Sequence, residues 1–165
     1  MKNALIIGGS SGIGFDTAQR LAARNVAVTI TGRDPAKLSR ASIALQQIGP
    51  TKIRTRVIDL YDQAHVDGFA RELATDTPFD YLVNSAGYFR PTPFLGHTRA
   101  DYRQYLDLNE SFFLVTQAVV GRLVEQKLTG SIVNIGSMWG HQAVKATPSS
   151  AYSMAKAGLH SFTQH

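Results

Sequence analysis

The chain alternates between short apolar or β-branched runs and longer segments with helical periodicity. The short runs have the length and composition of strands, and the longer segments repeat apolar residues at three- and four-residue spacing. The expected strands are residues 4–7, 26–31, 53–58, 81–83 and 131–135, and the expected helices are residues 15–24, 35–47, 62–74, 100–126 and one that starts near Ser149 or Ser150. Five strand-then-helix units in succession predict an α/β fold with a parallel sheet covered by helices on both faces.

The length of 165 residues predicts a single domain over residues 1–165, with a sizeable core. No internal repeat, low-complexity tract or linker interrupts it. The longest irregular stretches, residues 88–98 and 138–148, each follow an expected strand. Open parallel sheets bind ligands in the loops at the carboxyl ends of their strands, so we expect a site there.

Composition excludes several classes of function. The chain has no cysteine, which rules out disulfides and thiolate metal sites and fits a cytoplasmic protein. The net charge of +5 is spread along the chain, whereas a nucleic-acid binder more often carries a basic stripe. No segment approaches the apolar length of a membrane helix, and the start is too short for a signal peptide. We expect no metal, nucleic-acid or membrane ligand.

The stretch IIGGSSGIGFDTAQRLA joins the first expected strand to the first helix. Gly8, Gly12 and Gly14 allow a tight turn and close approach by a phosphate, and the helix behind them offers free N–H groups to an anion. The spacing is G-x-x-x-G-x-G, which differs from the G-x-G-x-x-G of the usual dinucleotide fingerprint. Taken alone, the segment also fits an ordinary Gly/Ser turn.

Tyr152 and Lys156 lie four residues apart in the last expected helix, so they share one face. A free phenol is a weak acid with a pKa of about 10, and a nearby ammonium favours its phenolate form. Such a pair suits proton transfer. A lone Tyr-x-x-x-Lys is more often an amphipathic surface pair, so it needs support from other motifs.

These motifs, in this order, resemble the short-chain dehydrogenase/reductase family in its single-domain form, over the whole of residues 1–165. The resemblance rests on the glycine turn, on Asp59 after the third strand, on Asn84, Ala86 and Gly87 after the fourth, and on Asn109, Ser137, Tyr152 and Lys156. Ile7 stands where the family usually has Thr, and Ser85 replaces a second Asn. The resemblance implies a Rossmann-type, doubly wound sheet.

The resemblance also implies a role for each matched residue. Tyr152 would be the acid/base, Lys156 would hold the cofactor ribose and favour the phenolate, and Ser137 would hold the substrate oxygen. Asn109 would hold a water in a proton relay, and Asp59 would contact adenine. From the residues alone, Ser137 also fits a loop serine and Asp59 also fits a helix cap.

The segment TITGRDP decides the expected cofactor. In the family, an acidic residue at the end of the second strand selects NAD, but Gly32 stands there and Arg33 follows. A guanidinium suits a 2′-phosphate, so NADP is expected over NAD; Arg33 as a solvated turn residue is the alternative. The expected cofactor-binding residues are Gly8, Ser10, Ser11, Gly12, Ile13, Gly14, Arg33, Asp59, Leu60, Asn84, Ala86, Gly87, Tyr152 and Lys156.

The function hypothesis is an NADP(H)-dependent oxidoreductase that interconverts a small-molecule carbonyl and an alcohol, in a protein expected to form homo-oligomers. A non-catalytic nucleotide-binding module is the main alternative, and an isomerase is a weaker one. The substrate is not readable from the loops, although Tyr88, Phe89, Phe94, Met138, Trp139 and Val144 are candidates for an apolar pocket.

Family members normally continue for two more strands beyond the last helix. We therefore expect the chain to be the N-terminal part of a longer reductase, with 131–135 as an exposed edge strand that seeks a partner. A form ending at His165 is expected to bind the adenine end of the cofactor but to turn over poorly.

Overall fold

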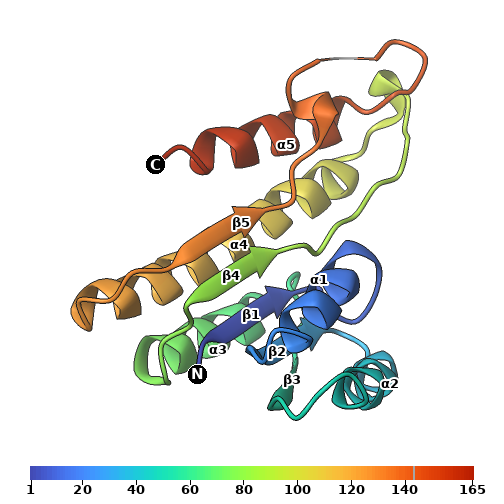
Figure 1. Cartoon of the computed structure of the whole chain (residues 1–165). Coiled ribbons are helices and arrows are strands. Elements are labelled where there is room, and N and C mark those ends of the chain that lie inside the picture. Colours follow the sequence, from blue (N-terminus) through green and yellow to red (C-terminus); the bar gives the residue numbers. More distant parts are fainter. Residues whose placement is uncertain (143) are drawn as a thin grey trace.

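The computed structural model describes residues 1–142 and 144–165 and contains a parallel five-stranded sheet in the order β3-β2-β1-β4-β5 (Figure 1). The strands are β1 Asn3–Ile7, β2 Ala27–Gly32, β3 Ile53–Val57, β4 Tyr81–Asn84 and β5 Ser131–Asn134. The crossover from β3 to β4 brings β4 beside β1. Strand order therefore reverses at β1, and this is where open α/β sheets form ligand clefts.

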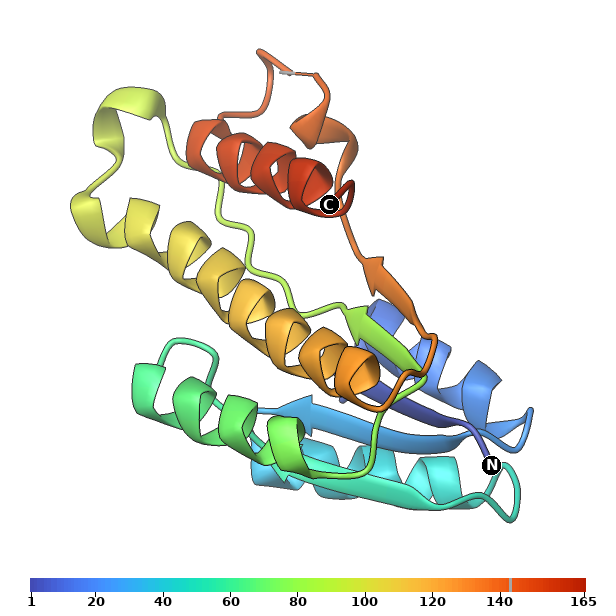
Figure 2. The ribbon, with the colours of Figure 1, turned by 90° about the vertical axis from the view of Figure 1, so that its left-hand side faces the viewer.

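Helices cover both faces of the sheet, which confirms the predicted doubly wound α/β fold. They are α1 Gly12–Ala22, α2 Pro35–Gln46, α3 Gln63–Thr75, α4 Arg99–Glu125 and α5 Ser150–Phe162, with short 3₁₀ turns η1 Phe94–Gly96 and η2 Met138–Gly140. In β1, Leu5 packs against α3 and α4 while Ile6 packs against α1 and α2, because successive strand side chains point to opposite faces. Figure 2 shows α3 and α4 side by side on the face of the sheet that they share.

Side-chain caps set the starts of three helices. Asp34 accepts hydrogen bonds from the backbone N–H groups of Ala36 and Lys37 at 2.9 and 3.1 Å and begins α2. Asp62 caps α3, and Thr98 begins α4 with a capping box. These caps satisfy N–H groups that have no partner within the helix.

Several element boundaries differ from the sequence prediction. The first helix begins at Gly12, three residues earlier than expected, because the glycine turn itself already winds into the helix. The fourth strand extends to Asn84, whose backbone pairs with Asn134 on β5. Gly12, Gly14 and Asn84 are therefore parts of regular elements, while Gly8 remains in the turn between β1 and α1.

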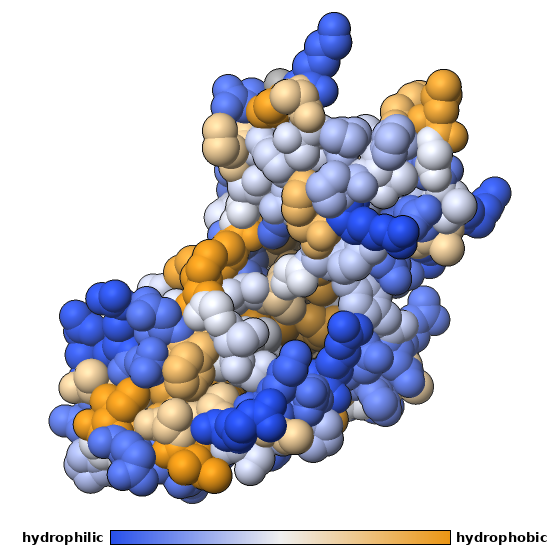
Figure 3. Space-filling model, turned by 90° about the vertical axis from the view of Figure 1, so that its right-hand side faces the viewer, coloured by the Kyte–Doolittle hydropathy of each residue, from blue (hydrophilic) through white to orange (hydrophobic). Residues whose placement is uncertain are grey.

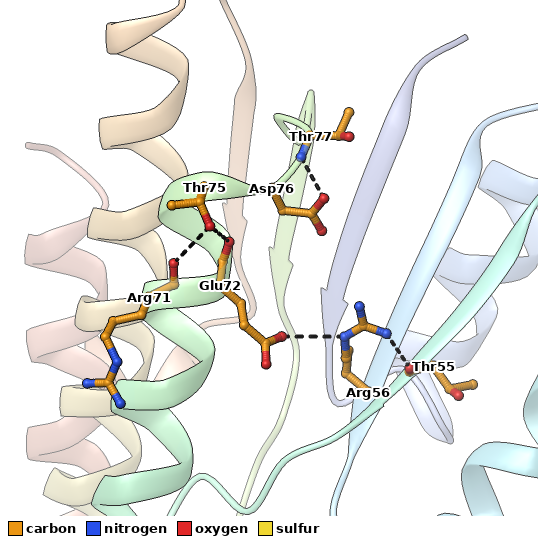
Figure 4. A network of polar contacts seen from close by, with 7 residues as sticks. All are labelled: Thr55, Arg56, Arg71, Glu72, Thr75, Asp76 and Thr77. Atoms are coloured by element: carbon orange, nitrogen blue, oxygen red, sulfur yellow. Dashed lines mark hydrogen bonds and ion pairs between the residues drawn. The ribbon is translucent and has the colours of Figure 1, made fainter.

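The two edges of the sheet differ in chemistry. Arg54 and Arg56 lie on β3, and Figure 4 shows Arg56 paired across to Glu72 of α3, with 3.6 Å between Nε and Oε2. Charged side chains of this kind discourage further strand pairing. The β5 edge instead carries Ile132 and Val133, and Val133 is about half exposed.

The core of this fold gives a paired test on one helix. Phe112 is fully buried between α4 and the sheet, and its neighbour Phe113 is 48% exposed and contacts Phe162. We expect Phe112→Ala to lower the free energy of unfolding by about 3–5 kcal/mol, because it leaves a cavity in a close-packed core. Phe113→Ala should cost less than about 1.5 kcal/mol. Urea unfolding measures both, and equal losses would contradict this description of the core.

Candidate functional site

A cleft of about 920 Å³ opens at the carboxyl ends of the strands, on the side of the molecule that Figure 3 faces. Its lining comes from the end of β2, from the segments that follow β1 to β4, and from Gln104 and Leu108 of α4. Ten of the predicted cofactor residues line it: Gly8, Ser10, Ser11, Gly12, Ile13, Arg33, Asp59, Leu60, Ala86 and Gly87. Residues spread over 80 positions of sequence thus meet in one cavity.

The glycine turn forms one wall of the cleft, and two of its glycines are required sterically. Gly8 has φ +81°, and a Cβ there would lie 2.6 Å from the backbone nitrogen of Ala86. A Cβ on Gly14 would collide with the carbonyl oxygen of Gly8, so Gly14 supports the turn from behind and does not line the cleft. Ser11 precedes α1 without a side-chain cap bond, which leaves N–H groups of the first turn available to an anion.

Asn84, predicted to bind the cofactor, lies outside the cleft lining. It is fully buried, and its Nδ2 donates to Thr116 Oγ1 at 3.0 Å and to Asn134 Oδ1 at 2.8 Å. It therefore ties β4 to β5 and to α4. Sequence reasoning placed it in a loop, but its position inside the sheet makes it a support for the floor of the site.

Two positively charged side chains lie at the connection between β2 and α2. Arg33 lines the cleft together with Lys37, which the sequence analysis missed. Asp34 lies between them, but its carboxylate caps α2, and the backbone N–H of Lys37 holds the pKa of that carboxyl below its usual range. The sequence did contain a signal for Lys37: it comes three residues after the Asp34 cap, so it lies in the first turn of α2, close to Arg33.

Asp59 does not cap the following helix. Its Oδ1 accepts the backbone N–H of Tyr61 at 3.0 Å, while Asp62 caps α3. The next residue, Leu60, is held through its carbonyl, which accepts the Ser111 hydroxyl at 2.6 Å. Tyr61 also lines the cleft, and burial raises the pKa of its phenol.

A second cluster surrounds Tyr152 and Lys156 on α5. Lys156 is 9% exposed, and its Nζ donates to the carbonyl oxygen of Ile135, just past β5, at 2.6 Å. The same Nζ lies 5.8 Å from the centre of the Tyr152 ring. Burial lowers the pKa of Lys156. An ammonium has three donors, so two remain after the bond to Ile135.

The other two predicted catalytic residues approach the same helix. Asn109, inside α4, donates from Nδ2 to the carbonyl oxygen of Ala155 at 2.8 Å and so joins α4 to α5. Ser137 begins η2, and its Oγ accepts the backbone N–H of Trp139 at 3.2 Å. Accepting that bond leaves the hydroxyl proton of Ser137 for another acceptor.

Aromatic rings enclose Tyr152. The rings of Phe89 and Trp139, two of the residues expected to line an apolar pocket, lie with their centres 4.8 and 5.9 Å from that of Tyr152. Tyr105 closes another side at 5.9 Å, and burial raises the pKa of its phenol. Phe94 and Met138 are mostly exposed and do not join this group.

Sequence comparison places these observations in a family. The profile of the family described as "short chain dehydrogenase" matches residues 2–165. The chain belongs to this family. A galactitol 2-dehydrogenase of Rhizobium johnstonii is 33% identical over 165 residues, and the alignment covers 99% of this chain and 63% of that protein. The carbonyl reductase [NADPH] 2 of Sus scrofa is also 33% identical, with 98% of this chain and 62% of that protein covered.

Solved structures of family members share the fold. A short-chain dehydrogenase from Sphingobium yanoikuyae in complex with NADPH is 30% identical with a TM-score of 0.87, and the match covers 95% of this chain and 61% of that one. The first curated relatives are similarly longer, and the chain spans 62–69% of the lengths of four of them. In the described residues, no helix is long and apolar enough to cross a membrane.

The buried ammonium of Lys156 predicts a specific dependence of stability on pH. Its folded-state pKa lies below the ordinary value of 10.5, so the folded state binds fewer protons than the unfolded state as the pH approaches that value. Stability contributed by this group must then rise with pH in that window. We expect the free energy of unfolding of the wild type, relative to Lys156→Met, to rise between pH 7 and 9.5.

Urea unfolding across this pH range measures the difference. Loss of the bond to Ile135 lowers the free energy of unfolding of Lys156→Met by the same amount at every pH, so the pH dependence of the difference still reports the pKa of Lys156. Lys52→Met, at an exposed lysine, is the matched control, and its free energy of unfolding should change with pH in parallel with that of the wild type. A parallel course for Lys156→Met as well would show that Lys156 has an ordinary pKa.

Proposed function

We propose that the protein is an NADP(H)-dependent oxidoreductase that interconverts a carbonyl and an alcohol, with Tyr152 as the acid/base. One observation carries the proposal most directly: a buried lysine is anchored beside a tyrosine at the carboxyl edge of a dinucleotide-type sheet. A structural lysine would more often point to solvent. Membership of a dehydrogenase family supports the same reaction class.

The residues of the chain divide the work of proton transfer. Tyr152 delivers a proton to the carbonyl oxygen or takes it from the alcohol. Lys156 favours the phenolate by its charge, because a cation in a partly desolvated site acts more strongly than in water. The free hydroxyl proton of Ser137 holds the substrate oxygen against Tyr152. The nicotinamide, when bound, supplies or accepts the hydride.

Asn109 acts between the two helices that carry the site. Its side-chain nitrogen is engaged with Ala155, and its Oδ1 remains for a water that leads from Lys156 towards solvent. The position of Asn109 inside a helix, where asparagine is a poor helix former, supports a role beyond the helix itself.

The cleft fits a dinucleotide. The glycine turn and the uncapped first turn of α1 would hold the pyrophosphate, and Asp59 and Leu60 would lie beside the adenine. Arg33 and Lys37 would hold a 2′-phosphate, and the Ser10 hydroxyl lies next to Gly32, 3.1 Å from where a Cβ on Gly32 would stand. Gly32 places no carboxylate there, which supports NADP over NAD.

The first test replaces the proton donor. Tyr152→Phe in the intact protein should lower kcat for carbonyl reduction about 10²–10⁴-fold, the usual contribution of general acid catalysis, while the Kd for NADPH changes less than about twofold. Tyr102→Phe is the matched control, since it removes a phenol from the same aromatic cluster. Turnover by the Tyr152→Phe protein close to that of the wild type would show that another group is the acid. NADPH binding without turnover of any aldehyde, ketone or polyol by the wild type would favour a nucleotide-binding module.

The second test concerns the choice of cofactor. Arg33→Ala should weaken NADPH binding about tenfold and leave NADH binding nearly unchanged, because only the 2′-phosphate loses its partner. Adding Lys37→Ala should reduce the difference between the Kd values for NADPH and NADH further. Arg71→Ala on α3, away from the cleft, removes the same charge and should change neither Kd (Figure 4). Fluorescence titration measures these constants, and equal affinities of the wild type for both cofactors would refute the preference.

A further inference from the structure

We propose that His160 is a positioning residue that holds Ser137 by accepting the hydrogen bond of its backbone N–H. The contact itself is independent of the reaction, and its effect on turnover rests on the proposed function. No feature of the sequence analysis pointed to His160.

The contact links the loop that carries Ser137 to the helix that carries Tyr152 and Lys156. The backbone nitrogen of Ser137 lies 3.2 Å from Nε2 of His160. His160 follows Lys156 by one helical turn and Tyr152 by two, so all three project from one side of α5. A rigid helix therefore sets the distance between Ser137 and the Tyr152/Lys156 pair.

The loop is shaped around the imidazole ring. A Cβ on Gly136 would collide with Nε2 of His160, and a Cβ on Gly140 would lie 2.9 Å from the Cε1 and Nδ1 atoms of the ring. The ring of His141 stacks on that of His160, with 4.2 Å between the centres and 29° between the planes. Two glycines and a stacked ring around one imidazole indicate a fitted contact rather than a chance approach.

The hydrogen bond specifies the protonation state of His160. Nε2 can accept the Ser137 N–H only when it carries no proton, so the neutral ring carries its proton on Nδ1. Nδ1 is buried and has no hydrogen-bond partner among the described residues. The titratable groups that face the ring are His141 from the loop and Lys156 from α5, and both are cations when protonated.

Burial, together with His141 and Lys156, lowers the pKa of His160. A histidine with a lowered folded-state pKa stabilises the fold above its ordinary range and loses that contribution as the pH falls through the lowered value. The Ser137 contact should therefore be intact at neutral pH and released in acid. If Ser137 holds the substrate oxygen, release of the Ser137 contact makes kcat fall at low pH, which adds an acid limb to the pH profile of kcat.

Two substitutions separate the hydrogen bond from the packing. His160→Gln can place an amide oxygen near the position of Nε2 and does not titrate, whereas His160→Phe keeps a ring and has no acceptor. His65→Gln, at an exposed histidine of α3, is the control. We expect His160→Phe to lower kcat about ten- to a hundredfold, as misplacement of a positioned group does, with the Kd for NADPH unchanged. His160→Gln should restore most of kcat at neutral pH and lack the acid limb.

The contact can be followed without turnover, which separates this proposal from the proposed function. In ¹⁵N-labelled wild-type protein, the protection of the Ser137 amide proton, which is its exchange rate compared with that of an unprotected amide at the same pH, should be high at neutral pH and fall as the His160 ring becomes protonated. His160→Gln should keep this protection at low pH, and His160→Phe should lack it at every pH. The wild-type titration alone decides the point if a variant fails to fold. A Ser137 amide that exchanges independently of His160, or equal kcat and pH profiles in both variants, would overturn the proposal.

Discussion

The bond from the buried ammonium of Lys156 to the carbonyl oxygen of Ile135 joins α5, which carries Tyr152, to the end of β5. Ile135 lies at the carboxyl end of β5, so the bond fixes α5 to the edge of the sheet. A lysine is rarely buried without a partner, because removing its charge from water costs several kcal/mol. The same bond that lowers this cost places the ammonium near the ring of Tyr152. Stability and the proposed proton chemistry therefore depend on one contact.

The sheet supplies the other part of the proposed site. Parallel strands end at a common edge, and the reversal of strand order between β2 and β4 leaves a cleft above β1. Gly8 allows Ala86 of the neighbouring loop to approach the turn, and Asn84 joins β4 to β5 beneath it. The order β3-β2-β1-β4-β5 thus places the glycine turn and the α5 cluster on one side of the molecule.

Much of this arrangement could be predicted from sequence because it depends on local patterns. The periodicity of the strands and helices, the Asp34 cap and the spacing of Tyr152 and Lys156 all follow from residues near one another in the chain. The roles of Asn84 and His160 could not be predicted, because they depend on partners far away in the sequence. The partners of Asn84 are 32 and 50 positions away, and that of His160 is 23 positions away. Tyr61 was missed for a different reason: its pattern fits an ordinary loop residue, and only the fold brings it to the cleft. Lys37 was missed although its place in the first turn after the Asp34 cap is readable from the sequence.

The central claim is that the cleft and the Tyr152 cluster form a single site for carbonyl reduction. The most direct test gives the intact protein NADPH carrying deuterium at both C4 positions, together with a panel of aldehydes and ketones. Mass spectrometry then follows the alcohols formed. The account predicts one deuterium at the carbinol carbon of the product from the wild type, and the same product formed about 10²–10⁴-fold more slowly by Tyr152→Phe. Tight NADPH binding with no deuterium transferred to any carbonyl by the wild type would contradict it.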